Sequence, residues 1–540
     1  MSPDGTRLVY AANGRLYLRS MSELESREVP GTGPAINPVF SPDGRSVAFW
    51  GDSMLKRIVV DTAGTAITIC EVGTSPSGMS WSDAGIVFSS IGTGIMRVSP
   101  NGGKPEVLVD MSKSDVLADG PQFLPGNRTL LFTVAKRAAA TIDRWDTAQI
   151  VVQSPGTSVR KTLIEGGSDA RYVPTGHIVY LSGGTVFAVP FELASLTVTG
   201  EAVPVIAGVR RVTGMMGMIG GAHLAFSNSG SVAYVPGSST QGEFVVFDRN
   251  GVVEAVKLPP GSYLFPRITR DGKRVAFETS DGKQAVVSIY ELSGESSVRR
   301  LTFGGNNRFP VWSPDGRRVA FQSDREGDAA VFWQPADGGT AERLTSAGRG
   351  VSHAPESWSP DGQVLLFSET KDFVSSLWTF SLRDRKAAPF SDVKGSTVPT
   401  NATFSPDGRW VAYQLGEGGQ GEANTYVQPF PPTGTRYQIS RGGRPAWSRD
   451  GKELFFVPAP GEFMVVRVRT EPSFAVTSPV AVPRRFGFAE PANPRPYDTL
   501  PDGRILRVAA PGLSQTGSGP AQIQIVLNWF EELKARAPRK

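Results

Sequence analysis

The sequence predicts an all-β protein made of two tandem six-bladed β-propellers with four-stranded blades, ending in a short C-terminal helix. Three observations support this prediction. A turn phrase recurs along the whole chain, its spacing is that of a propeller blade, and no long helical pattern interrupts the series. The 540 residues are too many for one ordinary core, and 61 glycines and 42 prolines indicate many turns.

The recurring phrase is an aromatic residue followed by Ser-Pro-Asp-Gly. Proline presets φ at the first turn position, aspartate accepts amide hydrogen bonds, and glycine takes the left-handed position, so the phrase predicts a tight hairpin. We interpret the aspartates as structural rather than as calcium ligands, because their constant place in the hairpin explains them. The clearest turn residues are Asp43, Gly44, Asp315, Gly316, Asp361, Gly362, Asp407 and Gly408.

Twelve turn glycines predict twelve blades. Neighbouring glycines such as Gly272, Gly316 and Gly362 are separated by the roughly 40–50 residues of a four-stranded blade. Clear copies lie at Gly5, Gly44, Gly272, Gly316, Gly362, Gly408, Gly451 and Gly503, and degenerate copies at Gly85, Gly126, Gly176 and Gly230.

Six plus six blades is the simplest division of this series, because one ring usually holds four to eight blades. The boundary is expected near residues 236–243 (PGSSTQGE), which have the composition of a linker. The first propeller then spans residues 1–240, and the second spans 241–540 with the C-terminal strand and helix. A seven-plus-five division is the alternative.

Each blade follows one pattern. The aromatic residue ends the first strand, and an alternating pair such as Val319 and Phe321 marks the second. A third strand follows, as at residues 331–333, and a fourth, as at 342–345.

The last blade raises the question of ring closure. Its second strand is expected at residues 505–508 and its third at 522–530, and the helix that follows leaves the fourth place to residues 254–258. The first propeller would then need a closing strand from upstream of Met1, so the chain is expected to begin inside a blade. An open first ring is the alternative.

Several phrases carry a family resemblance. The Ser-Pro-Asp-Gly-Arg-x-Val-Ala-Phe phrase is similar to the WD40-like (PD40) repeat of TolB-type propellers. Longer phrases resemble the extracytoplasmic propeller region of bacterial transmembrane serine/threonine protein kinases; they lie at residues 166–180, 300–321, 331–345, 426–434 and 526–534. The resemblance covers essentially the whole chain and implies a sensor outside the cytoplasm. The chain lacks the H-R-D loop, the D-F-G motif and the Gly-rich nucleotide loop, so kinase activity is not carried over.

The charge and the apolar content of the sequence limit the classes of binding partner and the cellular location that it allows. The formal charge of +5 combines 56 basic and 51 acidic residues, and this near balance argues against nucleic acid. No apolar stretch is long enough to span a bilayer, and the first residues lack the features of a signal peptide. The chain is therefore expected to be periplasmic or extracytoplasmic if the resemblance holds, and otherwise cytoplasmic. The oligomeric state stays open.

Motifs for catalysis or metal binding are scarce. No Gly-x-Ser-x-Gly elbow is present, which disfavours a propeller peptidase. His177 follows a turn and is expected to be exposed, whereas His223 and His353 are placed where they could approach the centre of a propeller as metal ligands. Met215, Met216 and Met218 are expected to pack in a core or loop rather than bind a soft metal. We therefore expect no catalytic residue, no metal and no cofactor.

Binding is the better functional hypothesis. A propeller presents a central opening rimmed by loops and by the starts of its innermost strands. Polar and aromatic residues at these starts are suited to an anionic ligand or a peptide terminus, and the alternative is that they only pair with each other. The candidates are Arg171, Tyr172, Arg267, Arg308, His353, Glu356 and Arg444.

The C-terminal helix is a second candidate surface. Trp529, Phe530 and Leu533 are expected to dock on the last blade, and the alternative is a face for a partner's groove.

Three functions follow from these observations. The first is a non-catalytic ligand- or protein-binding module, the sensor portion of a receptor-type kinase without its kinase domain. The second is a periplasmic assembly or translocation scaffold like TolB. The third, a propeller hydrolase or lyase, is disfavoured.

Overall fold

The structure is a computed structural model, and the elements below belong to the part of the chain that it describes. It describes residues 1–538 except for 13, 62–63, 74, 113–115, 137–141, 213–218, 238–241, 281–283, 295–296, 373, 395, 397–399, 417–422, 459–461, 472, 483–493 and 510–521. Antiparallel strands dominate these residues, and α1 (Trp529–Arg536) lies near the end of the chain. The predictions of an all-β class and of a short C-terminal helix are confirmed.

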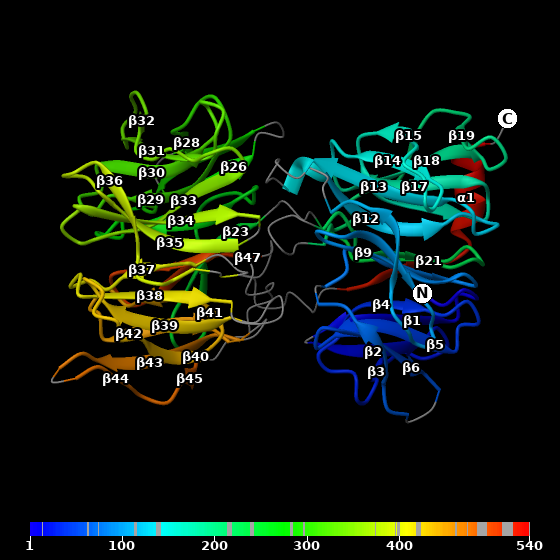
Figure 1. The fold of residues 1–540 in the computed structure, drawn as a ribbon, viewed down its shortest axis with the longest axis horizontal. Helices are drawn as coiled ribbons and strands as arrows, with labels where there is room; N and C mark the ends of the chain where they lie inside the picture. Colours follow the sequence, from blue (N-terminus) through cyan, green and yellow to red (C-terminus); the bar gives the residue numbers. More distant parts are fainter. Residues whose placement is uncertain are drawn as a thin grey trace. The chain divides into compact units, whose positions relative to one another are not determined.

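The chain forms two compact units that differ from the predicted domains at the C-terminus. Unit 1 contains Met1–Ser239 and Gly519–Lys540, and unit 2 contains Thr240–Ser518. Unit 2 is therefore an insertion in the chain of unit 1. Figure 1 shows the red C-terminal helix against the blue-to-cyan strands of unit 1.

Unit 1 contains six of the sheets that the structure describes. In chain order they are β1 (Arg7–Ala12), β2 (Arg15–Ser20) and β3 (Arg27–Glu28); β4 (Ile36–Phe40), β5 (Ser46–Gly51), β6 (Met54–Val59) and β7 (Ile67–Glu71); β8 (Met79–Ser82), β9 (Gly85–Ser90), β10 (Gly94–Val98) and β11 (Glu106–Asp110); β12 (Val116–Phe123), β13 (Leu130–Lys136), β14 (Gln149–Gln153) and β15 (Arg160–Glu165), with the 3-10 helix η1 (Ile142–Trp145) before β14; β16 (Ser168–Val173), β17 (His177–Ser182), β18 (Thr185–Glu192), β19 (Thr197–Val198) and β20 (Val203–Ile206); and β21 (Leu224–Phe226), β22 (Val232–Tyr234) and β48 (Gln524–Val526).

Unit 2 likewise contains six described sheets. They are β23 (Glu243–Phe247) and β24 (Val253–Ala255) with β46 (Tyr497–Thr499) and β47 (Ile505–Ala509); β25 (Leu264–Ile268), β26 (Arg274–Ser280), β27 (Ala285–Glu291) and β28 (Arg299–Arg300); β29 (Asn307–Trp312), β30 (Arg318–Ser323), β31 (Ala330–Pro335) and β32 (Glu342–Arg343); β33 (Val351–Trp358), β34 (Val364–Lys371), β35 (Val374–Ser381) and β36 (Lys386–Pro389); β37 (Thr403–Phe404), β38 (Trp410–Leu415), β39 (Asn424–Pro429) and β40 (Tyr437–Arg441); and β41 (Gly443–Trp447), β42 (Glu453–Val457), β43 (Met464–Arg469), β44 (Ala475–Val476) and β45 (Val480–Ala481).

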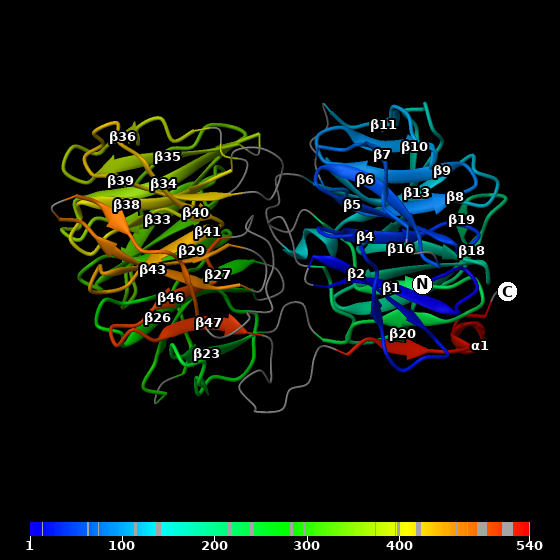
Figure 2. The same cartoon turned by 90° about the horizontal axis from the view of Figure 1, so that it is seen from below.

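The predicted closure of the last blade is wrong in its third strand. β47 pairs with β23, not with residues 522–530, and β24 takes the fourth place next to β23. β24 overlaps the expected strand at 254–258. Figure 2 shows β23 beside β47, two strands far apart in the sequence. The apolar run of β23, next to the predicted linker, supplies the missing strand.

The C-terminal segment closes the last sheet of unit 1, a role that the sequence analysis gave to a strand from upstream of Met1. β48 pairs antiparallel with β22, joining Val526 to Val232. The segment holds this place because Trp529, Leu533 and Ala537 of α1 are buried in one core with Val186 and Val232. Burial of this apolar face is the main driving force for the docking.

The turn phrase forms the predicted hairpin in both units. In the Ser-Pro-Asp-Gly copies the serine hydroxyl donates to the aspartate, as from Ser359 to Asp361 at 2.5 Å, and the amide two residues beyond the aspartate donates to the same oxygen. These donors lower the pKa of Asp361 below its ordinary value. Gly362 has a φ of 71°, in the left-handed region. Equivalent contacts surround Asp43, Asp315 and Asp407.

The hydrophobic cores lie between consecutive sheets. One core joins Val287 and Ile289 of β27 to Val319 and Phe321 of β30, and Trp312 at the end of β29 closes it. The aromatic residue before the turn and the alternating residues after it are thus the contacts that hold neighbouring blades together.

Candidate ligand-binding site

A β-bulge interrupts the first strand of many blades. The register of β25 shifts between Leu264 and Arg267, and within this shift Phe265 has a positive φ of 50°. A positive φ is uncommon in a residue other than glycine, and strained backbone of this kind is concentrated at functional sites. The same combination occurs at Asn37 of β4, Gly120 of β12, Asp169 of β16, Phe309 of β29 and Arg444 of β41.

The sequence contains a signal for these bulges that the sequence analysis missed. Asn37, Asp169, Phe265, Phe309 and Arg444 each lie seven residues before a turn glycine. Four of them, all except Asp169, are followed by proline, which disfavours helical backbone in the residue before it. The position seven residues before each turn therefore predicts a bulge that redirects side chains.

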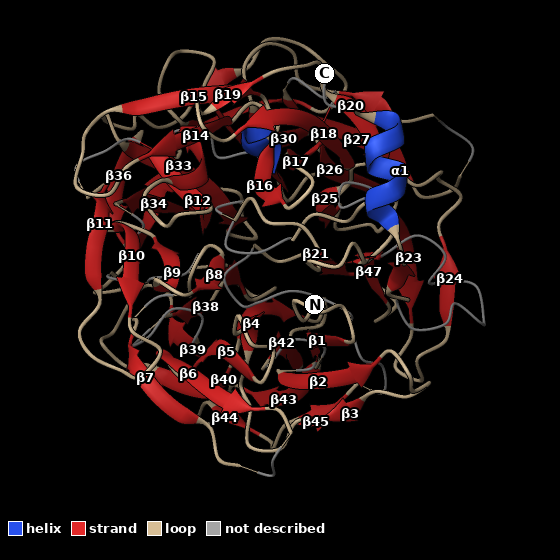
Figure 3. Ribbon diagram, turned by 90° about the vertical axis from the view of Figure 1, so that its right-hand side faces the viewer, coloured by secondary structure: helices blue, strands red, loops and turns tan. Residues whose placement is uncertain are grey.

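In unit 1 the bulged strands lie towards the middle of the unit. Figure 3 shows β4, β8, β12 and β16 towards the middle of unit 1, and β7, β11 and β15 at its rim. Contacts between first strands of different blades support this view. Asn37 donates from Nδ2 to the carbonyl oxygen of Pro76 at 2.7 Å, and Arg171 donates to the carbonyl oxygen of Gly120 at 3.2 Å.

Charged side chains from several sheets meet in unit 2, and we call Arg267, Glu356, Arg444, Arg495 and Asp498 the central cluster. Arg267 donates from Nη1 to the carbonyl oxygen of Arg495 at 3.0 Å. Arg495 donates to the carbonyl oxygen of Pro445 at 2.8 Å, and its Nη2 lies 3.6 Å from Oδ1 of Asp498.

Two neighbours complete the central cluster. The hydroxyl of Tyr497 donates to the carbonyl oxygen of Arg444 at 2.5 Å, and the hydroxyl of Thr400 donates to Oε1 of Glu356 at 2.8 Å. The structure therefore brings together three predicted residues, Arg267, Glu356 and Arg444. Arg495 and Asp498, which the sequence analysis did not select, join them.

Burial dominates the electrostatics of the central cluster. Burial, assisted by the charge of Arg495, lowers the pKa of Arg267 to about 9. Burial also raises the pKa of Glu356. Burial alone would raise the pKa of Asp498, but Arg449, Arg495 and Arg267 hold it below its ordinary value. Within the central cluster three arginines face two carboxyl groups.

Two of the bulge positions in unit 2 carry aromatic side chains that contact each other. Phe265 and Phe309 come from neighbouring blades, and their ring centroids are 5.0 Å apart. Both rings are half-buried, as are Arg267 and Glu356, whereas Arg444 is 2% and Arg495 7% exposed. The residues that reach solvent are thus one cation, one carboxyl group and two aromatic rings.

The middle of unit 1 is different, because the chain itself crosses it. We call residues 219–222 the crossing segment. The amide of Gly220 donates to Oδ2 of Asp119 at 2.9 Å, and the amide of Ala222 donates to Oδ2 of Asp169 at 2.8 Å. The hydroxyl of Ser168 donates to the carbonyl oxygen of Gly220 at 2.8 Å. Two blades thus hold the backbone of the crossing segment.

Replacing Gly220 by alanine is expected to destabilise unit 1 by about 1–3 kcal/mol, the usual cost of overpacking a core. A Cβ at Gly220 would lie 2.5 Å from the ring of Trp145, which is fully buried. Gly221→Ala is the matched control, because its Cβ would meet no atom closer than 3.8 Å. Urea unfolding of both variants measures the difference, and equal stabilities would contradict this account of Gly220.

Near the crossing segment, two acidic side chains are paired with arginines and a third, Asp119, is not. Arg171 lies 2.7 Å from Oδ1 of Asp169, and Arg211 lies 2.5 Å from Oδ1 of Asp146. Asp119 is fully buried, and its Oδ1 has no hydrogen-bond partner among the described residues. Burial, with a contribution from the charge of Asp169, raises the pKa of Asp119 to about 7.

The remaining predicted rim residues have local partners. Arg308 lies 3.7 Å from Glu278. His353 is buried, with Nδ1 at 3.0 Å from the hydroxyl of Thr345 and Nε2 at 3.2 Å from Glu369, and burial lowers its pKa. The amide of Tyr172 donates to Gln122 at 2.8 Å, and the ring packs on Phe191.

The prediction that His177 is exposed is wrong. Its side chain is buried, and Nε2 lies 2.7 Å from the carbonyl oxygen of Ala537, just beyond α1. The partner is hundreds of residues away in the sequence, so the turn context gave no sign of it. Trp529 and Leu533 do dock as expected, but on unit 1 rather than on the last blade.

No group of three histidine, cysteine, aspartate or glutamate side chains placed to hold a metal ion is found in the described ranges. Burial lowers the pKa of His223. The methionines at 215, 216 and 218 lie outside the described residues. None of the described helices is both long and apolar enough to cross a bilayer.

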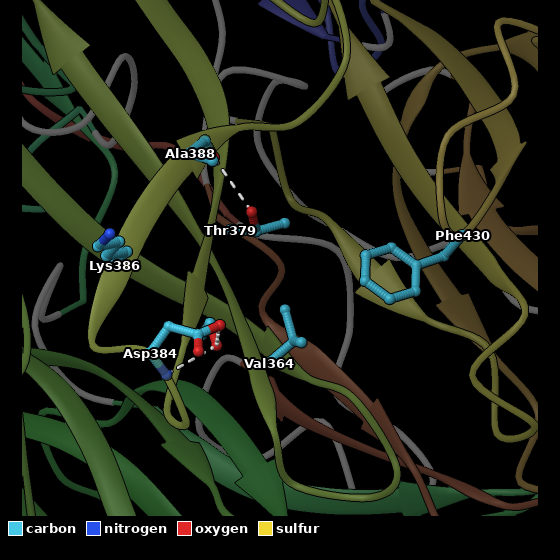
Figure 4. Close-up of a pocket in the computed structure, with 7 residues that line it drawn as sticks. Val364, Thr379, Asp384, Lys386, Ala388 and Phe430 are labelled. Atoms are coloured by element: carbon cyan, nitrogen blue, oxygen red, sulfur yellow. Dashed lines mark hydrogen bonds between the residues drawn. The ribbon is translucent and has the colours of Figure 1, made fainter.

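A shallow pocket of about 510 Å³ opens on the outer strands of one unit 2 blade (Figure 4). Its polar groups bond to one another. Thr379 donates to the carbonyl oxygen of Ala388 at 3.1 Å, and Ser381 donates to Asp384 at 3.0 Å. Phe430, which packs against Phe390 and Phe404, closes one side. The pocket therefore offers fewer unused polar groups than the central cluster.

Comparison with known proteins gives one family match. Residues 224–355 match the PD40 family, described as a TolB beta propeller domain. An uncharacterized peptidase, YuxL, of Bacillus subtilis is 30% identical over 35% of this chain and 28% of its own length. An uncharacterized protein of Agrobacterium fabrum is 25% identical over 34% of this chain and 62% of its own length. The chain thus matches less than two thirds of either relative.

Solved structures are more distant. A TolB-type protein from Agrobacterium tumefaciens is 18% identical, with a TM-score of 0.40 over 50% of this chain and 98% of that chain. TolB from Acinetobacter baumannii is 15% identical, with a TM-score of 0.36 over 58% of this chain and 79% of that one.

Proposed function

We propose that this TolB-like β-propeller protein is a non-catalytic module that binds a protein or peptide outside the cytoplasm. The match of residues 224–355 to the TolB propeller domain supports the scaffold alternative over a receptor-kinase sensor. A scaffold requires a lasting protein partner, whereas a sensor requires a ligand that is released.

One observation carries the proposal. Charged side chains from four sheets of unit 2 converge in the central cluster, and two of them, Arg267 and Glu356, remain partly exposed. A few convergent polar groups beside aromatic rings are typical of a ligand site. Peptidase chemistry is disfavoured because the sequence has no Gly-x-Ser-x-Gly elbow, although one relative is named a peptidase.

Selection from a random peptide library tests the proposal. Peptides selected on the purified chain are expected to bind it, and to bind the Arg267→Met variant at least 10-fold more weakly. Arg317→Met is the matched control, because Arg317 is an exposed turn residue. Failure to select any peptide, or equal binding to all three proteins, would overturn the proposal.

A further inference from the structure

Two arginines of the central cluster have donors without acceptors. Nε of Arg267 and Nε of Arg495 are both buried, and neither has a hydrogen-bond partner among the described residues. Among the described residues, the Arg267 side chain donates from Nη1 to the carbonyl oxygens of Pro266 and Arg495. A buried donor without an acceptor is destabilising, so these groups call for an external acceptor.

The neighbouring acids do not supply enough negative charge. Asp498 lies between Arg449, at 3.7 Å, and Arg495, at 3.6 Å, and is therefore shared by two cations. Glu356 already accepts a hydrogen bond from Thr400, and burial favours its neutral form. Among the described residues, Arg267 and Arg495 are packed together with only the shared carboxylate of Asp498 beside Arg495, and their mutual repulsion favours an added anion.

In unit 1, two arginines near the crossing segment have carboxylate partners. Arg171 and Arg211 each have a carboxylate oxygen within 2.7 Å, from Asp169 and Asp146 respectively. The crossing segment adds further hydrogen bonds there. In the central cluster of unit 2, by contrast, Nε of Arg267 and Nε of Arg495 have no acceptor among the described residues.

The residues next to these arginines indicate which class of anion would bind there. A guanidinium group matches a carboxylate in a planar, two-bonded geometry. Arg267 is half-buried, so an anion can reach it from solvent. Phe265, two residues before it on β25, packs against Phe309 with the two rings tilted at 46°. An apolar surface next to a cation suits a carboxylate that is attached to an apolar side chain.

We propose that the central cluster of unit 2 binds the carboxylate of a peptide, with Arg267 and Arg495 as donors and Phe265 and Phe309 as an apolar seat. The proposal rests on the proposed function and names the chemistry that the binding module recognises. The carboxylate belongs either to a peptide C-terminus or to an acidic side chain.

Calorimetric titration of the full chain with three synthetic peptides tests this inference. The probes are acetyl-Ala-Ala-Ala-Phe with a free C-terminus, the same peptide as its amide, and acetyl-Ala-Glu-Ala-Phe amide. At least one carboxylate peptide is expected to bind 10-fold or more tightly than the neutral amide. Preference for the first identifies a C-terminal carboxylate, and preference for the third identifies an acidic side chain.

Three variants locate the site. Arg267→Met and Arg495→Met are each expected to abolish the preference for carboxylate, and Arg267→Lys to retain part of it. Arg317→Met should bind as the unchanged protein does, and a thermal melt of each variant checks folding. Equal affinity for all three peptides, or a preference that survives in folded Arg267→Met, would overturn the carboxylate site. If library peptides nevertheless bind the unchanged protein at least 10-fold more tightly than Arg267→Met, the proposed function stands without it.

Discussion

A chain carrying Trp529→Ala is expected to lose stability in unit 1 and not in unit 2. Trp529 is 1% exposed, and its ring centroid lies 5.3 Å from that of Phe226. It belongs to the core that joins α1 to β18, β20 and β22. Truncating a buried aromatic residue of this kind costs about 3–5 kcal/mol. The loss belongs to unit 1 because β48 completes its last sheet and α1 packs into its core.

Hydrogen exchange in mildly destabilising urea measures this effect for each unit separately. Amides of β21 and β22 should exchange faster in the variant, while those of β46 and β47 keep their protection. Leu527→Ala is the control, because Leu527 is 62% exposed. Faster exchange in β46 and β47 alone would instead favour the closure that the sequence predicted, with the C-terminal strand in the last blade of the second propeller.

Asp119→Asn is expected to stabilise unit 1 at pH 8 and to have little effect at pH 4. The pKa of Asp119 is raised from 3.8 to about 7, so folding favours the protonated carboxyl group. The stability that this proton contributes is complete below about pH 4 and is lost as the pH rises through 7. Asparagine keeps the acceptor for the amide of Gly220 without a charge beside Asp169.

The free energy of unfolding should therefore differ between the two proteins by an amount that grows with pH, to an order of 4 kcal/mol at pH 8. Urea titrations at pH 4, 6 and 8 measure it. Asp169→Asn serves as a contrast, because it breaks the ion pair with Arg171 and should destabilise. A difference between Asp119→Asn and the unchanged protein that is constant with pH would contradict the burial argument.

Local sequence signals predicted the blades and their turns. The phrase around Asp361 combines a fixed φ, a side-chain acceptor and a left-handed glycine, and all three act within a few residues. The strands that end at Trp312 and begin near Val319 follow from the same local pattern. The TolB-like character of the repeat was recognised from these residues as well.

Partners that are distant in sequence were not predicted. β22 could pair with any exposed strand edge, and the choice of β48 depends on where Trp529 and Leu533 bury their side chains. His177 was misjudged for the same reason, because its partner is the carbonyl oxygen of Ala537.

The central cluster was predicted in part. Arg267, Glu356 and Arg444 precede recognisable turns, whereas Arg495 lies at the edge of a Pro-rich stretch with no clear strand pattern. Its role depends on packing against Pro445 and Asn401, which no local signal reveals.

The insertion of unit 2 has a consequence for synthesis on the ribosome. Tyr234 of β22 and its partner Gln524 are 290 residues apart. At a translation rate of about 5–20 residues per second, β48 is synthesised roughly 15–60 s after β22, and the edge of β22 is unpaired during that time. Unit 2 has all its strands before then, so the later-made unit can finish folding first. During that interval the open edge of β22 is a template for pairing with another nascent chain.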